Sequence, residues 1–166
     1  MHATTFPTMR IITVAAVLAL VAGLVVMAPA DARSAVPFRA LEVAQGAPNV
    51  GGECGETAIV IDDEAAGTGT HVGRFEIAFV ECFDFAAGTF TVEFVITAAN
   101  GDTLHGTYTG GFTSETNWVA EAEFAGGTGR FADADGSATL HGTIGADGYE
   151  QTWTGWISSL GHGHGR

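Results

Sequence analysis

The sequence predicts an all-β domain, and three observations lead to that prediction. Glycine is abundant with 24 residues and phenylalanine contributes 11, whereas lysine, a strong helix former, does not occur. Apolar and polar residues alternate with a period of two along most of the chain, as expected for strands with one face in water. Glycine-rich turns separate these stretches. Antiparallel strands with this spacing form either a closed barrel or a sandwich.

A cleaved signal peptide is expected over residues 1–32. Arg10 precedes an apolar run over residues 11–27, and the run ends in Ala28-Pro29-Ala30-Asp31-Ala32, a small-residue pattern typical of a signal-peptidase site. Cleavage is expected after Ala30 or Ala32. The alternative is an uncleaved anchor, because the run approaches the ~20 residues that span a bilayer. We therefore expect a secreted, extracellular protein with a barrel domain over residues 33–158 and a flexible Gly/His tail over residues 159–166.

Two weak strands are expected first, near residues 38–43 and 57–62. Stronger alternation follows over residues 71–85 and predicts an inward face made of His71, Phe75, Ile77, Phe79, Phe83 and Phe85. Glu81 interrupts this face. Either a buried acid or a β-bulge that turns the side chain outward would explain it.

Five further strands bring the expected number to about eight. Their predicted inward residues are the even positions of 90–96, 104–112, 118–124 and 138–144, followed by Tyr149, Gln151, Trp153 and Ile157. Asn100-Gly101-Asp102 is typical of a hairpin turn. A three-residue loop there sets Ile96 opposite Gly106 and keeps both apolar sets on one face, whereas a two-residue loop would separate them.

Charge and cysteine content limit the partners. The net charge is −13, and a field of that sign repels nucleic acids and anionic membrane surfaces, so neither is expected as a partner once the leader is removed. Cys54 and Cys82 are the only thiols. An exported protein with two cysteines favours a disulfide between them, and two free buried thiols are the alternative.

Three segments together resemble the allene oxide cyclase barrel group, which includes dirigent-like proteins, and in particular its small exported bacterial members. The segments are Gly67 to Phe75, Ala99 to Tyr108, and Gly126-Gly127-Thr128-Gly129-Arg130-Phe131 followed by Asp135-Gly136-Ser137. The resemblance implies an eight-stranded antiparallel barrel, often trimeric, with an apolar interior cavity. The acidic and amide residues that line the active sites of that group have no match here, so the resemblance extends to the fold and the cavity alone.

Histidines are considered first as metal ligands. His71 is expected to point inward, whereas His105 and His141 share the wet face with threonines, so the three do not converge as a zinc site requires. His162 and His164 could chelate a metal loosely, although a solvated tail is the simpler interpretation. No metal and no cofactor is expected.

The predicted interior is rich in aromatic residues and poor in polar groups. A barrel of about eight strands either fills itself with side chains or holds one small ligand. Residues expected to bind such a ligand are Phe75, Phe79, Phe94, Tyr108, Trp118 and Trp153. Weak candidates for acid or base catalysis are Glu81, His71 and Tyr108.

Three functions follow from this interior. The preferred hypothesis is a secreted acidic barrel that binds a small hydrophobic ligand, namely a lipid, phenol or terpenoid, without turnover. The alternative is a cyclase or isomerase that acts on such a ligand inside the cavity. The third is a structural or interaction protein whose barrel is filled by its own side chains.

Overall fold

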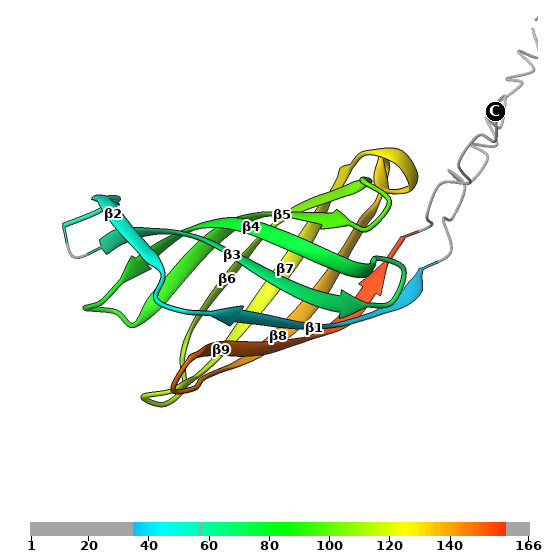
Figure 1. Ribbon diagram of the computed structural model, residues 1–166. Coiled ribbons are helices and arrows are strands. Elements are labelled where there is room, and N and C mark those ends of the chain that lie inside the picture. The colour runs from blue at the N-terminus through cyan, green and yellow to red at the C-terminus, as the bar shows by residue number, and fades with distance from the viewer. Residues whose placement is uncertain (1–34, 57, 159–166) are drawn as a thin grey trace, which may run out of the picture. The chain divides into compact units, whose positions relative to one another are not determined.

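The computed structural model describes residues 35–56 and 58–158. The predicted signal peptide and the Gly/His tail lie outside the described residues. The strands are β1 (Val36–Gln45), β2 (Asn49–Glu53), β3 (Ala58–Gly69), β4 (Gly73–Asp84), β5 (Thr89–Ala98), β6 (Thr103–Phe112), β7 (Asn117–Gly127), β8 (Asp135–Ile144) and β9 (Gly148–Ile157) (Figure 1). A short 3-10 helix, η1 (Gly129–Phe131), lies between β7 and β8.

Eight of these strands close into an antiparallel barrel in the order β1-β9-β8-β7-β6-β5-β4-β3. The ring closes because β3 returns to β1 through four residue pairs, from Ala40 with Gly69 to Val43 with Ala66. This pairing excludes the sandwich and confirms the predicted barrel. The remaining strand, β2, pairs with the first half of β3. It lies on the same edge of β3 whose second half pairs with β1.

The break between β1 and β2 opens the wall at one end of the barrel. Gly46 adopts a φ of 95°, a left-handed conformation that glycine reaches without strain, and Pro48 cannot donate a ladder hydrogen bond. Before the break, β1 pairs with β9 as far as Gln45 opposite Gly148. After it, the chain leaves β9 and joins β3 alone.

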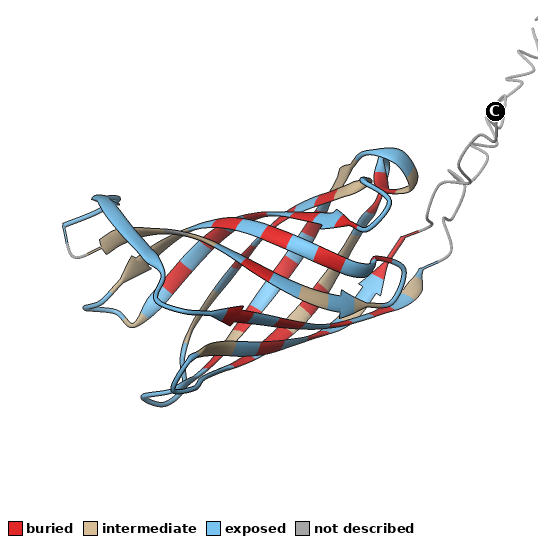
Figure 2. Cartoon of the chain, in the orientation of Figure 1, coloured by how far each residue is buried: buried red, intermediate tan, exposed pale blue. Residues whose placement is uncertain are grey.

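Alternation along the strands determines which residues line the interior, as predicted. Buried and exposed bands succeed each other along β5 and the other long strands (Figure 2). The most fully buried large side chains include Trp153, Phe38, Phe131, Ile77, Ile96, Leu104, Leu140 and Ile157. Aromatic rings in this core pack edge to face. The ring centroids of Phe38 and Phe124 are 4.8 Å apart, and those of Phe94 and Trp153 are 5.3 Å apart.

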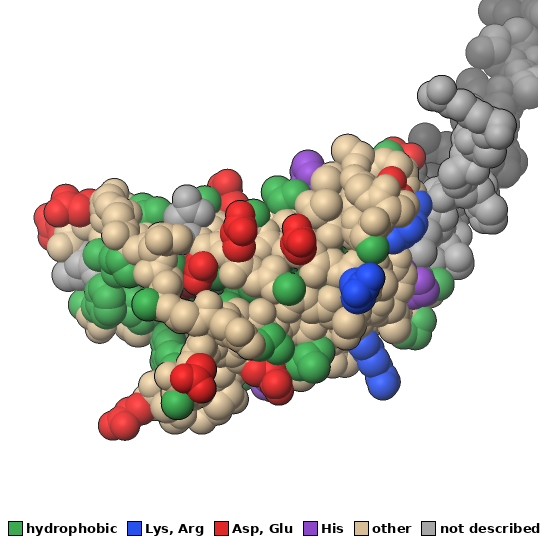
Figure 3. Space-filling model, in the orientation of Figure 1, with side chains coloured by type: hydrophobic (Ala, Val, Ile, Leu, Met, Phe, Trp, Pro, Cys, Tyr) green, Lys and Arg blue, Asp and Glu red, His purple; other side chains and the backbone are tan. Residues whose placement is uncertain are grey.

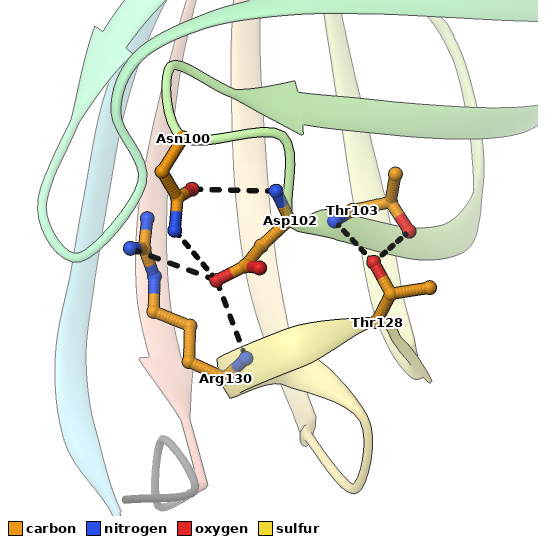
Figure 4. Close-up of polar contacts among 5 residues, drawn as sticks. All are labelled: Asn100, Asp102, Thr103, Thr128 and Arg130. Carbon is orange, nitrogen blue, oxygen red and sulfur yellow. Dashed lines mark hydrogen bonds and ion pairs between the residues drawn. The ribbon is translucent and has the colours of Figure 1, made fainter. Parts of the chain in front are cut away.

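One end of the barrel is closed by the loop around η1. Phe131 is fully buried there, and the carboxylate of Asp102 holds the loop by accepting hydrogen bonds from the Asn100 amide at 2.8 Å and from the Arg130 backbone N–H at 3.3 Å. Thr103 and Thr128 add hydrogen bonds beside it (Figure 4). Two of the segments that carry the family resemblance therefore pack on each other, where they close the barrel.

The hairpin between β5 and β6 differs from the prediction in register. Ile96 lies opposite Leu104 rather than Gly106, because the three-residue loop is Ala99-Asn100-Gly101 and not Asn100-Gly101-Asp102. Gly101 has a φ of 87°, and a left-handed residue belongs at the last position of such a loop. The shift of two residues leaves every side chain on its predicted face.

Three other expectations were incomplete or wrong. β2 was not predicted, because Asn-Val-Gly-Gly-Glu shows no alternation and is exposed throughout. His71 does not point inward: it lies in the β3–β4 turn with a φ of 66°, and its ring Nε2 donates to the Pro37 carbonyl at 3.1 Å. Phe85 lies beyond the end of β4 and is 62% exposed.

A disulfide joins Cys54, which follows β2, to Cys82 in β4, with a Cα–Cα distance of 6.1 Å. The bridge crosses β3, because Val60 of β3 is the cross-strand partner of Cys82. It therefore ties the short strand β2 to the wall of the barrel and confirms the predicted pairing.

Replacing both cysteines by alanine is expected to lower the free energy of unfolding by roughly 3–4 kcal/mol, because the bridge constrains an unfolded loop of this length. Urea unfolding of the oxidised protein and of the double variant measures the difference. A reductant should destabilise the parent protein to the level of the variant and leave the variant unchanged. A loss below about 1 kcal/mol would contradict the expectation.

Candidate functional site

A cavity of about 480 Å³ occupies the open end of the barrel, opposite η1. Apolar and aromatic residues form most of its wall: Val50, Ile59, Ile61, Phe79, Phe83, Phe85, Phe90, Phe112 and Ile144. Polar or polar-tipped side chains come from five strands: Asp63, Glu81, Tyr108, Trp118, Tyr149 and Gln151. The mouth end of the molecule, where β2 lies in Figure 1, carries a cluster of hydrophobic side chains in Figure 3.

Aromatic rings form a connected belt around the cavity. Phe112 meets Phe83 at 5.7 Å and Trp118 at 5.8 Å between ring centroids, and Trp118 continues to Tyr149 at 5.6 Å. Phe79 meets Tyr149 at 6.4 Å, edge to face. Such edge-to-face and tilted pairs are favourable contacts, and here they join rings of β4, β6, β7 and β9 into one wall.

A buried carboxylate lies behind this wall. Glu42 of β1 is fully buried and accepts three hydrogen bonds from successive inward residues of β9: Tyr149 Oη at 2.6 Å, Gln151 Nε2 at 2.8 Å and Trp153 Nε1 at 3.0 Å. Gln151 is its direct cross-strand partner, and the other two lie two residues to either side. Trp118 extends the network by donating to Gln151 Oε1 at 3.4 Å.

Burial governs the acid–base properties of this network. It raises the pKa of Glu42, while the hydrogen bonds from Tyr149, Gln151 and Trp153 oppose that shift. The pKa values of Tyr108 and Tyr149 rise well above their ordinary values, chiefly through burial and secondarily through the negative charge of Glu42. Both tyrosines therefore stay protonated near neutral pH.

Glu81 of β4 is one of two acids that line the cavity, the other being Asp63 of β3. The β4–β5 ladder runs without a register shift past Phe79, Glu81 and Phe83, so the bulge considered from the sequence is absent from this described ladder and the acid faces inward. Burial raises the pKa of its carboxyl to about 7. It makes no hydrogen bond or ion pair with any other residue that the structure describes.

The residues expected to bind a ligand separate into two groups. Phe79, Tyr108 and Trp118 line the cavity, whereas Phe75, Phe94 and Trp153 lie in the packed core. Of the candidate catalytic residues, Glu81 and Tyr108 share the cavity and His71 lies in the exposed β3–β4 turn, outside it. Two inward acids, Glu42 and Asp63, were not predicted from the sequence. Alternation points both inward: Glu42 shares its face of β1 with Phe38 and Ala40. Asp63 shares its face of β3 with Ile59 and Ile61.

Neither a metal centre nor a transmembrane helix is found in the described part of the chain. His105 and His141 are exposed on the outer face, as predicted. Nowhere in residues 35–56 and 58–158 do three or more His, Cys, Asp or Glu side chains form a group able to hold a metal ion. Within the same residues, no helix combines the length and the apolar character that crossing a bilayer requires.

Comparisons of this chain with protein-family models, with curated proteins and with solved structures give no match. The fold and the geometry of the cavity are therefore the basis for a functional assignment.

Glu42→Leu is expected to lower the free energy of unfolding by at least about 3 kcal/mol, because the buried donors of Gln151 and Trp153 and the half-buried hydroxyl of Tyr149 lose their acceptor, and each unsatisfied group costs roughly 1–3 kcal/mol. Glu42→Gln should cost much less, since the amide oxygen can accept from Gln151 and Trp153 and the Tyr149 hydroxyl can rotate. Denaturant unfolding measures both. Glu123→Leu, an exposed position on β7, is the control and should stay within about 0.5 kcal/mol of the parent. Equal losses at positions 42 and 123 would show that the network does not stabilise the barrel.

The raised pKa of Glu81 makes stability depend on pH. A carboxyl that binds its proton more tightly in the folded state stabilises the fold at pH values below about 4.5, and this contribution disappears as the pH rises through about 7. Between pH 5 and pH 8, the free energy of unfolding of the parent protein should fall by about 1 to 2 kcal/mol relative to that of Glu81→Gln. This figure is reduced for solvent screening at the cavity mouth. Urea unfolding across this range tests it. Glu93→Gln on the outer wall should follow the parent, and parallel curves for all three proteins would refute the assignment.

Proposed function

We propose that this protein is a secreted barrel that binds a small hydrophobic molecule, a lipid, phenol or terpenoid, in the cavity at its open end, without turnover. The observation that supports this most directly is a cavity of about 480 Å³ with a wall of aromatic and aliphatic side chains and a few polar groups. Small-molecule sites have this size and this composition. The disulfide is compatible with an extracellular location.

The same proposal places the chain as a remote member of the allene oxide cyclase barrel group. Its support is the eight-stranded antiparallel ring and the packing of the Gly126 to Phe131 segment on the Asn100 to Asp102 turn. A homotrimer, as that resemblance implies, is part of the proposal. Apolar side chains on the outer wall, such as Leu41 at 39% and Trp156 at 42% exposure, offer surface for association.

A second candidate function is a cyclase or isomerase that works inside the cavity. The observation that favours it is Glu81, a carboxyl with a pKa of about 7 that faces the cavity shared with Tyr108. A carboxyl poised near neutral pH can take or give a proton at a bound molecule. If a molecule that copurifies with the secreted protein is converted by the parent, Glu81→Gln should retain binding and lose conversion. Binding without conversion by the parent would leave the binding function alone.

The uncharged fluorophore N-phenyl-1-naphthylamine tests the proposed function directly. The parent protein is expected to bind it at one site with enhanced emission, because the probe leaves water for an apolar cavity. Ile59→Trp fills part of the mouth and should weaken binding at least tenfold, whereas Val95→Trp, on the outer wall of β5, should not. Circular dichroism checks that both variants fold. No binding by the parent, or equal binding by both variants, would favour a barrel without a ligand site.

A further inference from the structure

We propose that the cavity selects a hydrophobic organic cation, a lipophilic amine or quaternary ammonium compound, over a neutral or anionic molecule of the same shape. This inference rests on the proposed function and specifies the chemical class of the ligand. Its basis is the combination of inward acids, aromatic rings and three committed hydrogen-bond donors in one cavity.

The charged side chains that line the cavity are all acidic. Glu81 on β4 and Asp63 on β3 face it from adjacent strands, since Glu81 pairs with Ile61 and Phe79 pairs with Asp63. Glu42 adds a third carboxyl behind the wall. None of the lining residues, all of which belong to the described part of the chain, is Arg or His. An anionic ligand would therefore meet like charges and find no cation to compensate them.

Three of the hydrogen-bond donors in the lining are committed elsewhere. Tyr149 Oη and Gln151 Nε2 donate to Glu42, and Trp118 Nε1 donates to Gln151. A ligand carboxylate or phosphate needs N–H or O–H groups directed at it, and these three are directed into the wall.

Glu81 supplies a charge that no other described residue pairs with. Its carboxyl makes no hydrogen bond or ion pair with any other described residue, and it lies in a wall built from Phe79, Phe83 and Phe90. A cation seated there gains a carboxylate and the faces of aromatic rings, which attract positive charge and bind ammonium groups with particular preference. The titratable groups facing it from the other strands, Asp63, Tyr108 and Tyr149, carry no positive charge.

The distribution of charge over the barrel reinforces this selection. The basic side chains of the described residues, Arg39, Arg74 and Arg130, lie near the closed end, and Figure 3 shows blue side chains gathered there while red ones extend to the mouth. The mouth therefore carries a negative field, which draws cations toward the cavity and repels anions.

Displacement of N-phenyl-1-naphthylamine by three ten-carbon probes tests the inference at pH 8, below the concentrations at which each probe forms micelles. Decyltrimethylammonium should displace the reporter at a concentration at least tenfold lower than 1-decanol, and decanoate should be weaker than both. Glu81→Gln should reduce the preference for the cation about tenfold while 1-decanol is unaffected. Glu93→Gln changes the total charge equally on the outer wall and should leave the preference intact.

Several outcomes would overturn the inference. A cation that is no better than 1-decanol in the parent removes the selectivity and leaves the proposed function standing, because the reporter is still bound. An equal effect of Glu81→Gln and Glu93→Gln assigns the preference to the overall charge and not to the cavity. Direct calorimetric binding of the cation by Ile59→Trp at parental strength shows that it binds the acidic surface. Failure of the parent to bind the reporter overturns the proposed function itself.

Discussion

Contact between β1 and β9 decides the architecture of this barrel, and the carboxylate of Glu42 sets how those strands meet. Its three donors are successive inward residues of β9, so a slip of two residues along the ladder would leave at least one of them without an acceptor. β1 is also the strand that closes the ring through its four pairs with β3. A buried acid thus specifies the β1–β9 register of the same strand that closes the ring against β3.

The way in which β1 closes the ring also makes the two ends of the barrel different. Because β1 pairs with β3 only as far as Val43 and leaves β9 after Gln45, while β2 takes over the edge of β3, the wall is continuous near η1 and interrupted at the mouth. The closed end is filled by Phe131 and Val72 and fastened by Asp102, whose pKa is lowered by its hydrogen bonds from Asn100 and the backbone of Arg130. The disulfide fixes β2 over the other end. A cavity at one end of the barrel results from this asymmetry, not from any single lining residue.

The strands and their faces could be predicted from the sequence, because each long strand has one face exposed to solvent. The alternation of polar and apolar residues therefore indicates which side chains point inward. Barrel closure was predicted from the family resemblance and not from alternation, since it depends on pairing between residues 40–43 and 66–69, which no local pattern records. The β5–β6 register required the rule that the left-handed glycine ends a three-residue loop, which places Gly101 last. His71 was misplaced because parity was extended past the start of β4 at Gly73.

The candidate site was less predictable than the fold, for a related reason. Three of the six residues expected to bind a ligand line the cavity, and the others fill the core, because alternation distinguishes inside from outside but not the packed end from the hollow one. Glu42 shares its face with Phe38 and Ala40, so its inward position was readable. Its role as a hydrogen-bond acceptor could not be predicted, because its three donors lie more than 100 residues further along the chain.

Glycines on the inner face explain how so many rings fit into a small barrel. A Cβ at Gly106 would lie 2.5 Å from the Phe94 ring, and one at Gly142 would lie within the Trp118 indole. Each ring thus rests on a glycine of the neighbouring strand, since Phe94 pairs with Gly106 and Trp118 with Gly142. Laying rings flat on bare backbone in this way keeps the wall thin and aromatic. The space left at the mouth is then bounded by ring surfaces and by the one unpartnered carboxyl of Glu81 among the described lining residues, and that pairing of features gives the cavity its expected preference for positive charge.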